Sequence, residues 1–151
     1  MIALGVRCSN TDLAYSLLTG GQQAPVVLQS GDLAFPKNFA RPQRLTWIVQ
    51  EVEGLVRQHH AELVVIRSFE GLKKGTAYEE RVEAEAAVAV AAGNCGIKAL
   101  YKKRKNTLAK DLGFKGRGKY LQLLDTSVIA GFESLSPKVQ EAVICAWSGL
   151  R

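Results

Sequence analysis

The stretch IALGVRCSNTDLAYSLL, residues 2–18, predicts a β-hairpin, because two apolar segments flank the short polar run SNT. Side chains alternate between the two faces of a strand. Ala3, Gly5 and Arg7 therefore share one face of the first strand, and the apolar residues at positions 2, 4, 6 and 8 share the other. Two very small residues thus lead up to one long cation. The face that carries Arg7 either lies close beneath another element or opens onto a site.

The composition predicts one domain over residues 1–151. The chain has 47% apolar residues, and a chain of this length buries roughly two-thirds of its unfolded surface. It contains no run of about 18 to 20 apolar residues, which a membrane span requires. The N-terminus also lacks a basic region followed by an apolar core and a cleavage site. We therefore expect a soluble, cytoplasmic protein that does not bind membranes.

The cysteines and histidines give no indication of a metal site. Cys8, Cys95 and Cys145 are far apart and form no CxxC pair, so we expect reduced, mostly buried thiols. The two histidines are adjacent at the predicted end of a helix, which favours a role at the helix C-terminus over a zinc site. The glycines of GFKGRGKY, residues 113–120, do not follow a strand and open a helix, so no organic cofactor is expected.

Positive charge is concentrated in residues 98–119, where nine basic residues face one acid, Asp111. Tyr101, Phe114, Tyr120 and three glycines are interleaved with them. Glycines let backbone N–H groups approach phosphates, and aromatic rings stack on bases. The segment is therefore either a solvated charged surface or a nucleic-acid contact. Its basic residues are Lys98, Lys102, Lys103, Arg104, Lys105, Lys110, Lys115, Arg117 and Lys119.

Further elements follow the hairpin. Residues 24–35 predict a third strand, broken at Gly31, with a turn at Gly20 and Gly21 before it. Apolar residues at helical spacing predict an amphipathic helix over residues 42–60 that packs one face on the sheet. ELVVIRS, residues 62–68, is continuously apolar at its centre, which is typical of a buried parallel strand.

The second half of the chain predicts one short strand and several helices. Thr76 and Glu79 match a capping box, so a helix is expected from Thr76 to a stop at residues 93–94. A strand is expected at residues 96–101, a short helix at 106–113 and the beginning of another helix within 118–132. Ser136 as N-cap and Pro137 at the first position predict a final amphipathic helix.

This order of elements resembles the ribonuclease H-like fold. The likeness is carried by residues 2–18, by LVVIRSFEG at residues 63–71 and by SPKVQEAVICAW at residues 136–147. The spacing is most similar to that of RuvC-type Holliday junction resolvases and of small, uncharacterised bacterial relatives. The resemblance implies an α/β fold with a central five-stranded mixed sheet, the first three strands antiparallel, flanked by helices.

The resemblance also implies a site at which this chain departs from the family. Active members begin with an apolar-Gly-apolar-Asp pattern, and the position of that aspartate is Arg7 here. A second family carboxylate ends the fourth strand, where this chain has Arg67, with Glu70 three residues on. The final family motif is Asp-Ala, and Glu141 is followed by an alanine here. In active members about four such carboxylates hold two divalent ions that hydrolyse a phosphodiester.

Three hypotheses follow. The preferred one is a nucleic-acid-binding protein, acting on DNA or RNA, with a non-catalytic, arginine-substituted site that holds no metal. Arg7 and Arg67 would either contact phosphate or pair with Glu70 or Glu85 in a structural network. The residues assigned to nucleic acid are Arg7, Arg67, Lys73, Lys74, Lys102, Lys103, Arg104, Lys105, Lys115, Arg117 and Lys119.

The second hypothesis is a nuclease that acts on branched or structured nucleic acid. Rearranged carboxylates, Glu70, Glu85 and Glu141, would be catalytic and would hold Mg²⁺ or Mn²⁺. The third is a homodimeric protein-interaction module whose basic segment docks an acidic partner. Salt-dependent nucleic-acid affinity separates the first two hypotheses from the third. Metal-dependent cleavage separates the second from the first.

Overall fold

The computed structural model describes residues 1–115 and 120–151. Its centre is a five-stranded mixed sheet with strand order β3-β2-β1-β4-β5. The β1–β2 and β2–β3 pairs are antiparallel, whereas β4 runs parallel to both β1 and β5. The predicted five-stranded mixed sheet, with its first three strands antiparallel, is confirmed. The strands are β1 Ala3–Cys8, β2 Asp12–Gly21, β3 Ala24–Ala34, β4 Leu63–Arg67 and β5 Ala99–Lys103.

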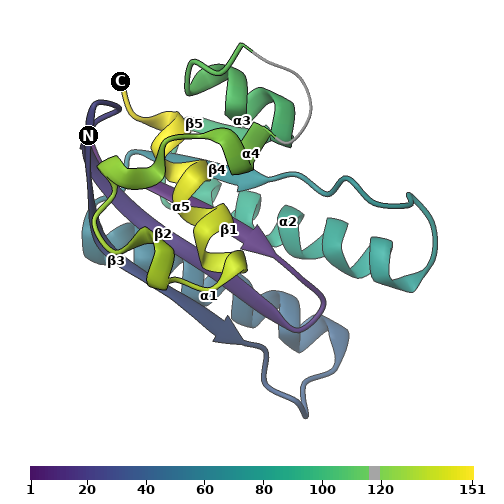
Figure 1. Cartoon of the computed structure of the whole chain (residues 1–151). Helices are drawn as coiled ribbons and strands as arrows, with labels where there is room; N and C mark the ends of the chain where they lie inside the picture. The colour runs from purple at the N-terminus through teal and green to yellow at the C-terminus, as the bar shows by residue number, and fades with distance from the viewer. Residues whose placement is uncertain (116–119) are drawn as a thin grey trace.

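Helices cover both faces of the sheet (Figure 1). Helices α1 (Arg41–His59) and α2 (Thr76–Asn94) pack on one face, and α5 (Pro137–Gly149) packs on the other. Between β5 and α5 the chain forms the short helices α3 (Lys105–Asp111) and α4 (Tyr120–Leu123). Two 3₁₀ turns follow, η1 (Thr126–Val128) and η2 (Phe132–Ser134). The sheet therefore separates two apolar cores, and no helix in the described ranges is long and apolar enough to cross a membrane.

The small residues that precede Arg7 lie directly beneath α5. A Cβ atom added to Gly5 would lie 2.0 Å from the carbonyl oxygen of Ala142 and 2.5 Å from the backbone nitrogen of Ala146. Only a residue without a side chain permits this approach of helix and strand. Of the two arrangements that the sequence left open, Ala3 and Gly5 take the first. Arg7, two residues further along, contacts Glu141 of α5.

The hairpin between β2 and β3 differs from its prediction. Gly20 and Gly21 belong to β2 and pair with Pro25 and Ala24, so the turn lies at residues 22–23. Gly20 still needs its freedom, because its φ is +87°. Gly31 does not break β3: it lies opposite Tyr15, whose ring would be 3.1 Å from a Cβ there. The irregularity falls between Leu17 and Leu18 instead.

The helix ends are partly as predicted. Ser136 caps α5, accepting a hydrogen bond from the Val139 amide at 3.4 Å. The capping box of α2 is absent: Gly75 is the N-cap, and no side chain caps the helix. Glu79 Oε2 instead lies 3.7 Å from Arg41 Nη2. Within residues 118–132, the only α-helical part among the described residues is Tyr120–Leu123, and the chain then turns through η1 and η2.

The turn at the C-terminal end of α2 extends further than predicted, so the next strand begins later in the sequence. The Ile97 amide donates to Ala92 O at 2.9 Å, and Gly96 has a φ of +76°, so β5 begins at residue 99 rather than 96.

The three cysteines are free thiols as expected. Burial raises the pKa of Cys145 to about 12. This thiol is therefore un-ionised at neutral pH.

Candidate functional site

Three cations form a row across the α5-facing side of the sheet. Strands β1, β4 and β5 run parallel, so their carboxyl ends meet at one edge of the sheet. Arg67 pairs in register with Lys103, and Arg7 follows the register pair of Val6 and Ile66 by one residue. Residues level with one another on neighbouring strands project to the same face. The fold itself therefore brings Arg7, Arg67 and Lys103 together.

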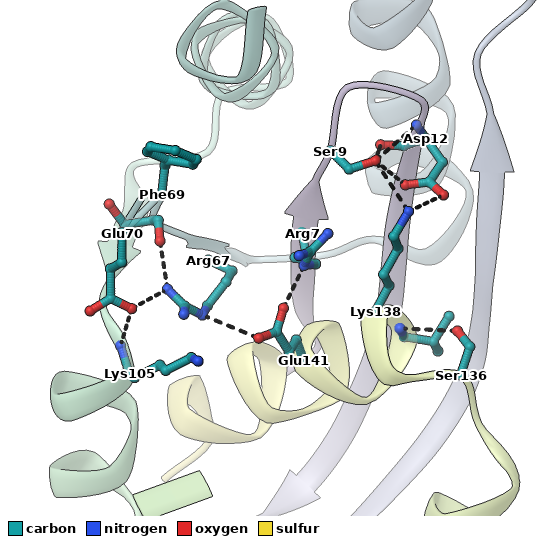
Figure 2. Close-up of polar contacts among 12 residues, drawn as sticks. Arg7, Ser9, Asp12, Arg67, Phe69, Glu70, Lys105, Ser136, Lys138 and Glu141 are labelled. Atoms are coloured by element: carbon teal, nitrogen blue, oxygen red, sulfur yellow. Dashed lines mark hydrogen bonds and ion pairs between the residues drawn. The ribbon is translucent and has the colours of Figure 1, made fainter. Parts of the chain in front are cut away.

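Glu141 of α5 lies between the two arginines (Figure 2). Arg7 Nε donates to Glu141 Oε2, and Arg67 Nε lies 3.8 Å from Glu141 Oε1. Side-chain exposure is 20% for Arg7 and 23% for Glu141, but only 5% for Arg67. The expected partner of Arg7 was Glu70 or Glu85, whereas the structure places Glu141 there.

Arg67 is fixed from its other side. Its Nη1 donates to Glu70 Oε2 at 2.7 Å and to the carbonyl oxygen of Ser68 at 2.5 Å. Glu70 Oε2 also accepts from the backbone nitrogen of Lys105 at 3.1 Å, at the start of α3. The result is a line of alternating charge from β1 across α5 to α3 (Figure 2).

The third cation of the row is neutralised locally. Lys103 Nζ lies 2.8 Å from Asp111 Oδ2. It also donates to both the backbone and side-chain oxygens of Ser148 at 3.2 Å. Lys103 thereby ties β5 to α3 and to the end of α5, which is a structural role.

The opposite side of the same edge holds a buried ion cluster around Glu85 of α2, which is 1% exposed. Glu85 accepts from the Phe69 amide at 3.0 Å and lies 2.9 Å from Lys102 Nζ and 3.7 Å from Arg81 Nε. Arg81 also lies over the Phe69 ring, 5.2 Å from its centroid. Burial, followed by the charge of Glu85, raises the pKa of Cys8 to about 12. Glu85 thus joins α2, β5 and the segment after β4.

Comparison with known proteins identifies the fold. No protein-family model matches the chain, and no curated protein matches its sequence. Among solved structures, Thermus thermophilus RuvC matches with a TM-score of 0.79 and 15% identity over 98% of this chain and 92% of that chain. The same values hold for that RuvC in complex with a Holliday junction substrate. The chain has a RuvC-type ribonuclease H-like fold.

Two further structures share this RuvC-like fold. The yeast mitochondrial Holliday junction resolvase matches with a TM-score of 0.62 and 12% identity, over 97% of this chain and 76% of that chain. The fowlpox virus resolvase, in complex with substrate Holliday junction DNA, matches with a TM-score of 0.54 and 11% identity over 99% and 96%. At identities this low the similarity extends to the fold alone, and the chemistry of the site depends on the side chains of this chain.

The RuvC-like sheet does not collect the three carboxylates of the nuclease hypothesis on one side. Glu70 and Glu141 lie on the α5 side, and Glu85 lies on the α2 side. Each is within 3 Å of a cationic nitrogen. Across residues 1–115 and 120–151, no three His, Cys, Asp or Glu side chains gather in a way that could hold a metal ion.

A further ion pair on the α5 side, between Lys138 and Asp12, was not predicted from the sequence. Lys138 Nζ lies 2.7 Å from Asp12 Oδ2, and Ser9 donates to the other oxygen of Asp12 (Figure 2). Burial raises the pKa of Asp12, but the hydrogen bonds from Lys138 and Ser9 outweigh it, so this pKa lies below its usual range. Burial and the charge of Asp12 raise the pKa of neighbouring Asp32. The only signal in the sequence was the position of Lys138 near the predicted start of α5.

A cleft of about 760 Å³ opens in front of the arginine site. Arg7 and Glu141 line it together with Lys105 of α3, Lys138 of α5 and Phe132 of η2. The Arg7–Glu141 pair is therefore reached from solvent, whereas Arg67 lies behind it.

The other basic residues predicted to contact nucleic acid differ in exposure. Lys73, Lys74, Arg104, Lys105 and Lys115 are exposed and form no ion pair with any described residue. Lys102 is 44% exposed although it contacts Glu85, and Lys103 is half-buried. Arg117 and Lys119 lie outside the described residues. The unpaired positive charge of this set thus lies in the segment after β4, at the start of α3 and at Lys115 beyond the end of α3.

Proposed function

We propose that this protein binds nucleic acid through its RuvC-like fold and does not cleave it by two-metal hydrolysis. The nucleic-acid part is supported by the neighbours, because Thermus thermophilus RuvC and the fowlpox virus resolvase were both solved with Holliday junction DNA. The non-catalytic part rests on one observation. Arg7 and Arg67 bracket Glu141 at the edge of the sheet where the family resemblance calls for metal-binding aspartates.

Two guanidinium groups at this position oppose metal binding. A two-metal site needs several carboxylates free to coordinate two divalent ions, about 3.5–4 Å apart. Here Glu141 and Glu70 already serve as counter-ions of Arg7 and Arg67. A divalent ion would have to displace a guanidinium and would be repelled by the other one.

The same groups suit phosphate. An arginine fork forms paired, charge-assisted hydrogen bonds with phosphate oxygens. Exposed Arg104 and Lys105 continue the positive charge from the carboxyl end of β5, and Lys73 and Lys74 lie in the segment after β4. Ligands of open α/β sheets bind at the carboxyl ends of parallel strands. The basic residues at this edge could therefore follow a phosphate backbone.

The metal-dependent nuclease, with Glu70, Glu85 and Glu141 as ligands of Mg²⁺ or Mn²⁺, is the alternative enzymatic function. It requires all three carboxylates to exchange their present cationic partners for a metal ion. The homodimeric interaction module is the second alternative. No observation on the α5 side favours either over nucleic-acid binding.

Binding is tested by fluorescence anisotropy with a four-way DNA junction, a linear duplex and single-stranded RNA, over a salt series in EDTA. We expect the logarithm of the affinity to fall linearly with the logarithm of salt concentration. Lys105→Glu should weaken binding about tenfold at low salt and reduce the salt slope by about one or more.

Lys98→Glu is the matched control, because it makes the same charge change just before β5, at the opposite edge of the sheet. It should change the affinity less than about twofold. Equal losses for Lys98→Glu and Lys105→Glu would show that net charge alone drives binding. Undetectable binding of every probe at low salt would instead favour the interaction module.

A further inference from the structure

The ion pair between Arg7 and Glu141 leaves hydrogen-bonding capacity unused. Glu141 offers one planar carboxylate to two guanidinium groups, accepting from Arg7 Nε and lying 3.8 Å from Arg67 Nε. Arg7 Nη1 and Arg67 Nε are both buried, and neither has a hydrogen-bond partner among the described residues. Buried donors without acceptors are costly, so the free protein leaves this site incompletely satisfied.

Positive charge is also in excess around these arginines. Arg81 lies on the other side of the sheet edge, and burial lowers its pKa first. The charge of Arg7 lowers it next, Glu85 and Cys8 raise it, and Arg67 lowers it further. Arg7 and Arg67 thus act on Arg81 as like charges, and an anion bound between them would weaken this repulsion.

The two carboxylates that contact Arg67 are not equally replaceable. Glu70 is held by Arg67 Nη1 and by the backbone nitrogen of Lys105, where it satisfies the first turn of α3. Both carboxylates line the cleft, but Glu141 has no contact of this kind with backbone nitrogen in the described residues. An anion that enters the cleft can therefore replace Glu141 while Glu70 stays bound to the Lys105 backbone and keeps Arg67 oriented.

We infer that Glu141 occupies a phosphate subsite in the free protein and that one phosphate group of a bound strand displaces it to contact Arg7 and Arg67. The choice of phosphate rests on the proposed function. A tetrahedral phosphate presents more acceptor oxygens than a carboxylate, so it can also satisfy the two N–H groups that Glu141 leaves unpaired. Glu141 is thus an internal competitor whose carboxylate opposes ligand binding.

The test is a titration with inorganic phosphate, at constant ionic strength, followed by the ¹H–¹⁵N signals of the arginine Nε–H groups. In the wild-type protein, phosphate should shift the Arg7 signal. Glu141→Gln, which keeps the shape and removes the charge, should tighten phosphate binding on the order of tenfold. In Arg7→Ala, phosphate should no longer shift the Nε–H signal of Arg67, the other arginine of the subsite.

Glu133→Gln is the matched control for the removal of one negative charge. Glu133 lines the same cleft but contacts Thr126 Oγ1, and it contacts no arginine within residues 1–115 and 120–151. If Glu133→Gln tightens binding as much as Glu141→Gln, the effect is general electrostatics and the subsite is excluded. A phosphate titration that leaves the Arg7 signal unmoved in both wild type and Glu141→Gln also overturns the inference.

Oligonucleotides then identify the source of the phosphate. A short strand with a 5′-phosphate, the same strand with a 5′-hydroxyl and inorganic phosphate are compared on the Arg7 signal. Equal shifts with both strands indicate an internal phosphodiester, and a shift with the phosphorylated strand alone indicates a strand end. Nucleic-acid binding that persists through Lys105 without any Arg7 shift overturns the subsite and leaves the proposed function standing.

Discussion

Glu85 and Glu141 are two carboxylates on opposite faces of the same sheet edge, and their surroundings differ sharply. Glu85 is 1% exposed and has a backbone amide, Lys102 and Arg81 around it. Glu141 is 23% exposed, lines a cleft and leaves buried arginine donors unpaired. The nuclease hypothesis assigns both of them to a rearranged metal site, yet one belongs to the packed interior and the other to an accessible surface.

The difference shows that the degree of burial determines whether a charged residue contributes mainly to stability or is available to a ligand. A buried carboxylate with several donors cannot exchange its partners without exposing uncompensated charge, so its effect is on stability. A partly exposed carboxylate between two cations costs little to displace, because water and ligand reach it. The α2 side of the edge therefore holds the fold together, and the α5 side is the place where ligands can compete.

The largest expected effect on the free energy of unfolding comes from disrupting the close contact between α5 and β1 at Gly5. Gly5→Ala places a Cβ against backbone atoms of α5, which cannot move away as a flexible side chain could. Unfolding in urea should show a loss of about 3 kcal/mol or more. Gly54→Ala, in α1 with no atom within 4 Å of the new Cβ, should instead stabilise by about 0.5–1 kcal/mol. Similar stabilities for the two variants would contradict the close approach of α5 to β1.

The comparison of the carboxylates is tested directly by truncating each one. Glu85→Ala strands Lys102, Arg81 and the Phe69 amide, so the free energy of unfolding should fall by about 3 kcal/mol. Glu141→Ala should cost about 1 kcal/mol, because its ion pair with Arg7 is reached by solvent. Chemical denaturation of both variants measures the two losses in the free energy of unfolding. Equal losses would contradict the proposed difference between the α2 side and the α5 side of the sheet edge.

Arg7→Ala should separate stability from binding. The free energy of unfolding should fall by about 1 kcal/mol, since the ion pair it loses is partly exposed. The affinity for a four-way DNA junction should fall about tenfold, because a phosphate contact is removed. A loss near 3 kcal/mol with unchanged affinity would place Arg7 among the structural ion pairs, with Glu85.

The smallest expected effect concerns the pH dependence contributed by Asp12 and Asp32. The pKa of Asp12 is lower in the folded protein, so its stabilisation is present above its unfolded pKa and is lost as the pH falls through the folded value. The raised pKa of Asp32 acts in the opposite sense, because protonation at low pH relieves a cost present at neutral pH.

Melting curves between about pH 3 and pH 6 test these signs, since unfolded aspartates titrate near pH 4. Asp12→Asn should flatten the loss of stability in acid, and Asp32→Asn should steepen it, each by less than about 1 kcal/mol. The reverse order of the two variants would contradict the assignment of Lys138 as the partner of Asp12.

The features that the sequence predicted are those set by neighbouring residues. The alternation in residues 2–18, the apolar stripe and Ser136 cap of α5, and the buried run of β4 all depend on local chemistry. The order of these elements then sufficed for the fold. The predicted helix cap was wrong where two neighbouring residues each favoured a different N-terminus of the helix. Thr76 and Glu79 match a capping box, but Gly75 begins α2 without a side-chain cap.

The partner of Arg7 could not be predicted, because it depends on the whole fold. Arg7 and Glu141 are 134 residues apart in the sequence, and they meet because α5 crosses β1 directly over Gly5. On a helical wheel Glu141 falls outside the apolar stripe of α5, a position that by itself indicates a solvent-facing residue. The division of Lys102 and Lys103 between the two faces follows from strand alternation, but it required the bounds of β5.

The central claim is that an arginine-substituted RuvC-like site binds nucleic acid without metal-dependent cleavage. Its most direct test is a four-way DNA junction, incubated with the protein in EDTA, in Mg²⁺ and in Mn²⁺ at matched ionic strength. Binding and strand integrity are followed on native and denaturing gels. The account predicts that the protein binds the junction in EDTA, where no divalent ion is free, and that the strands stay intact in all three solutions. Cleavage that requires a divalent ion and disappears in Glu70→Gln or Glu141→Gln would contradict it.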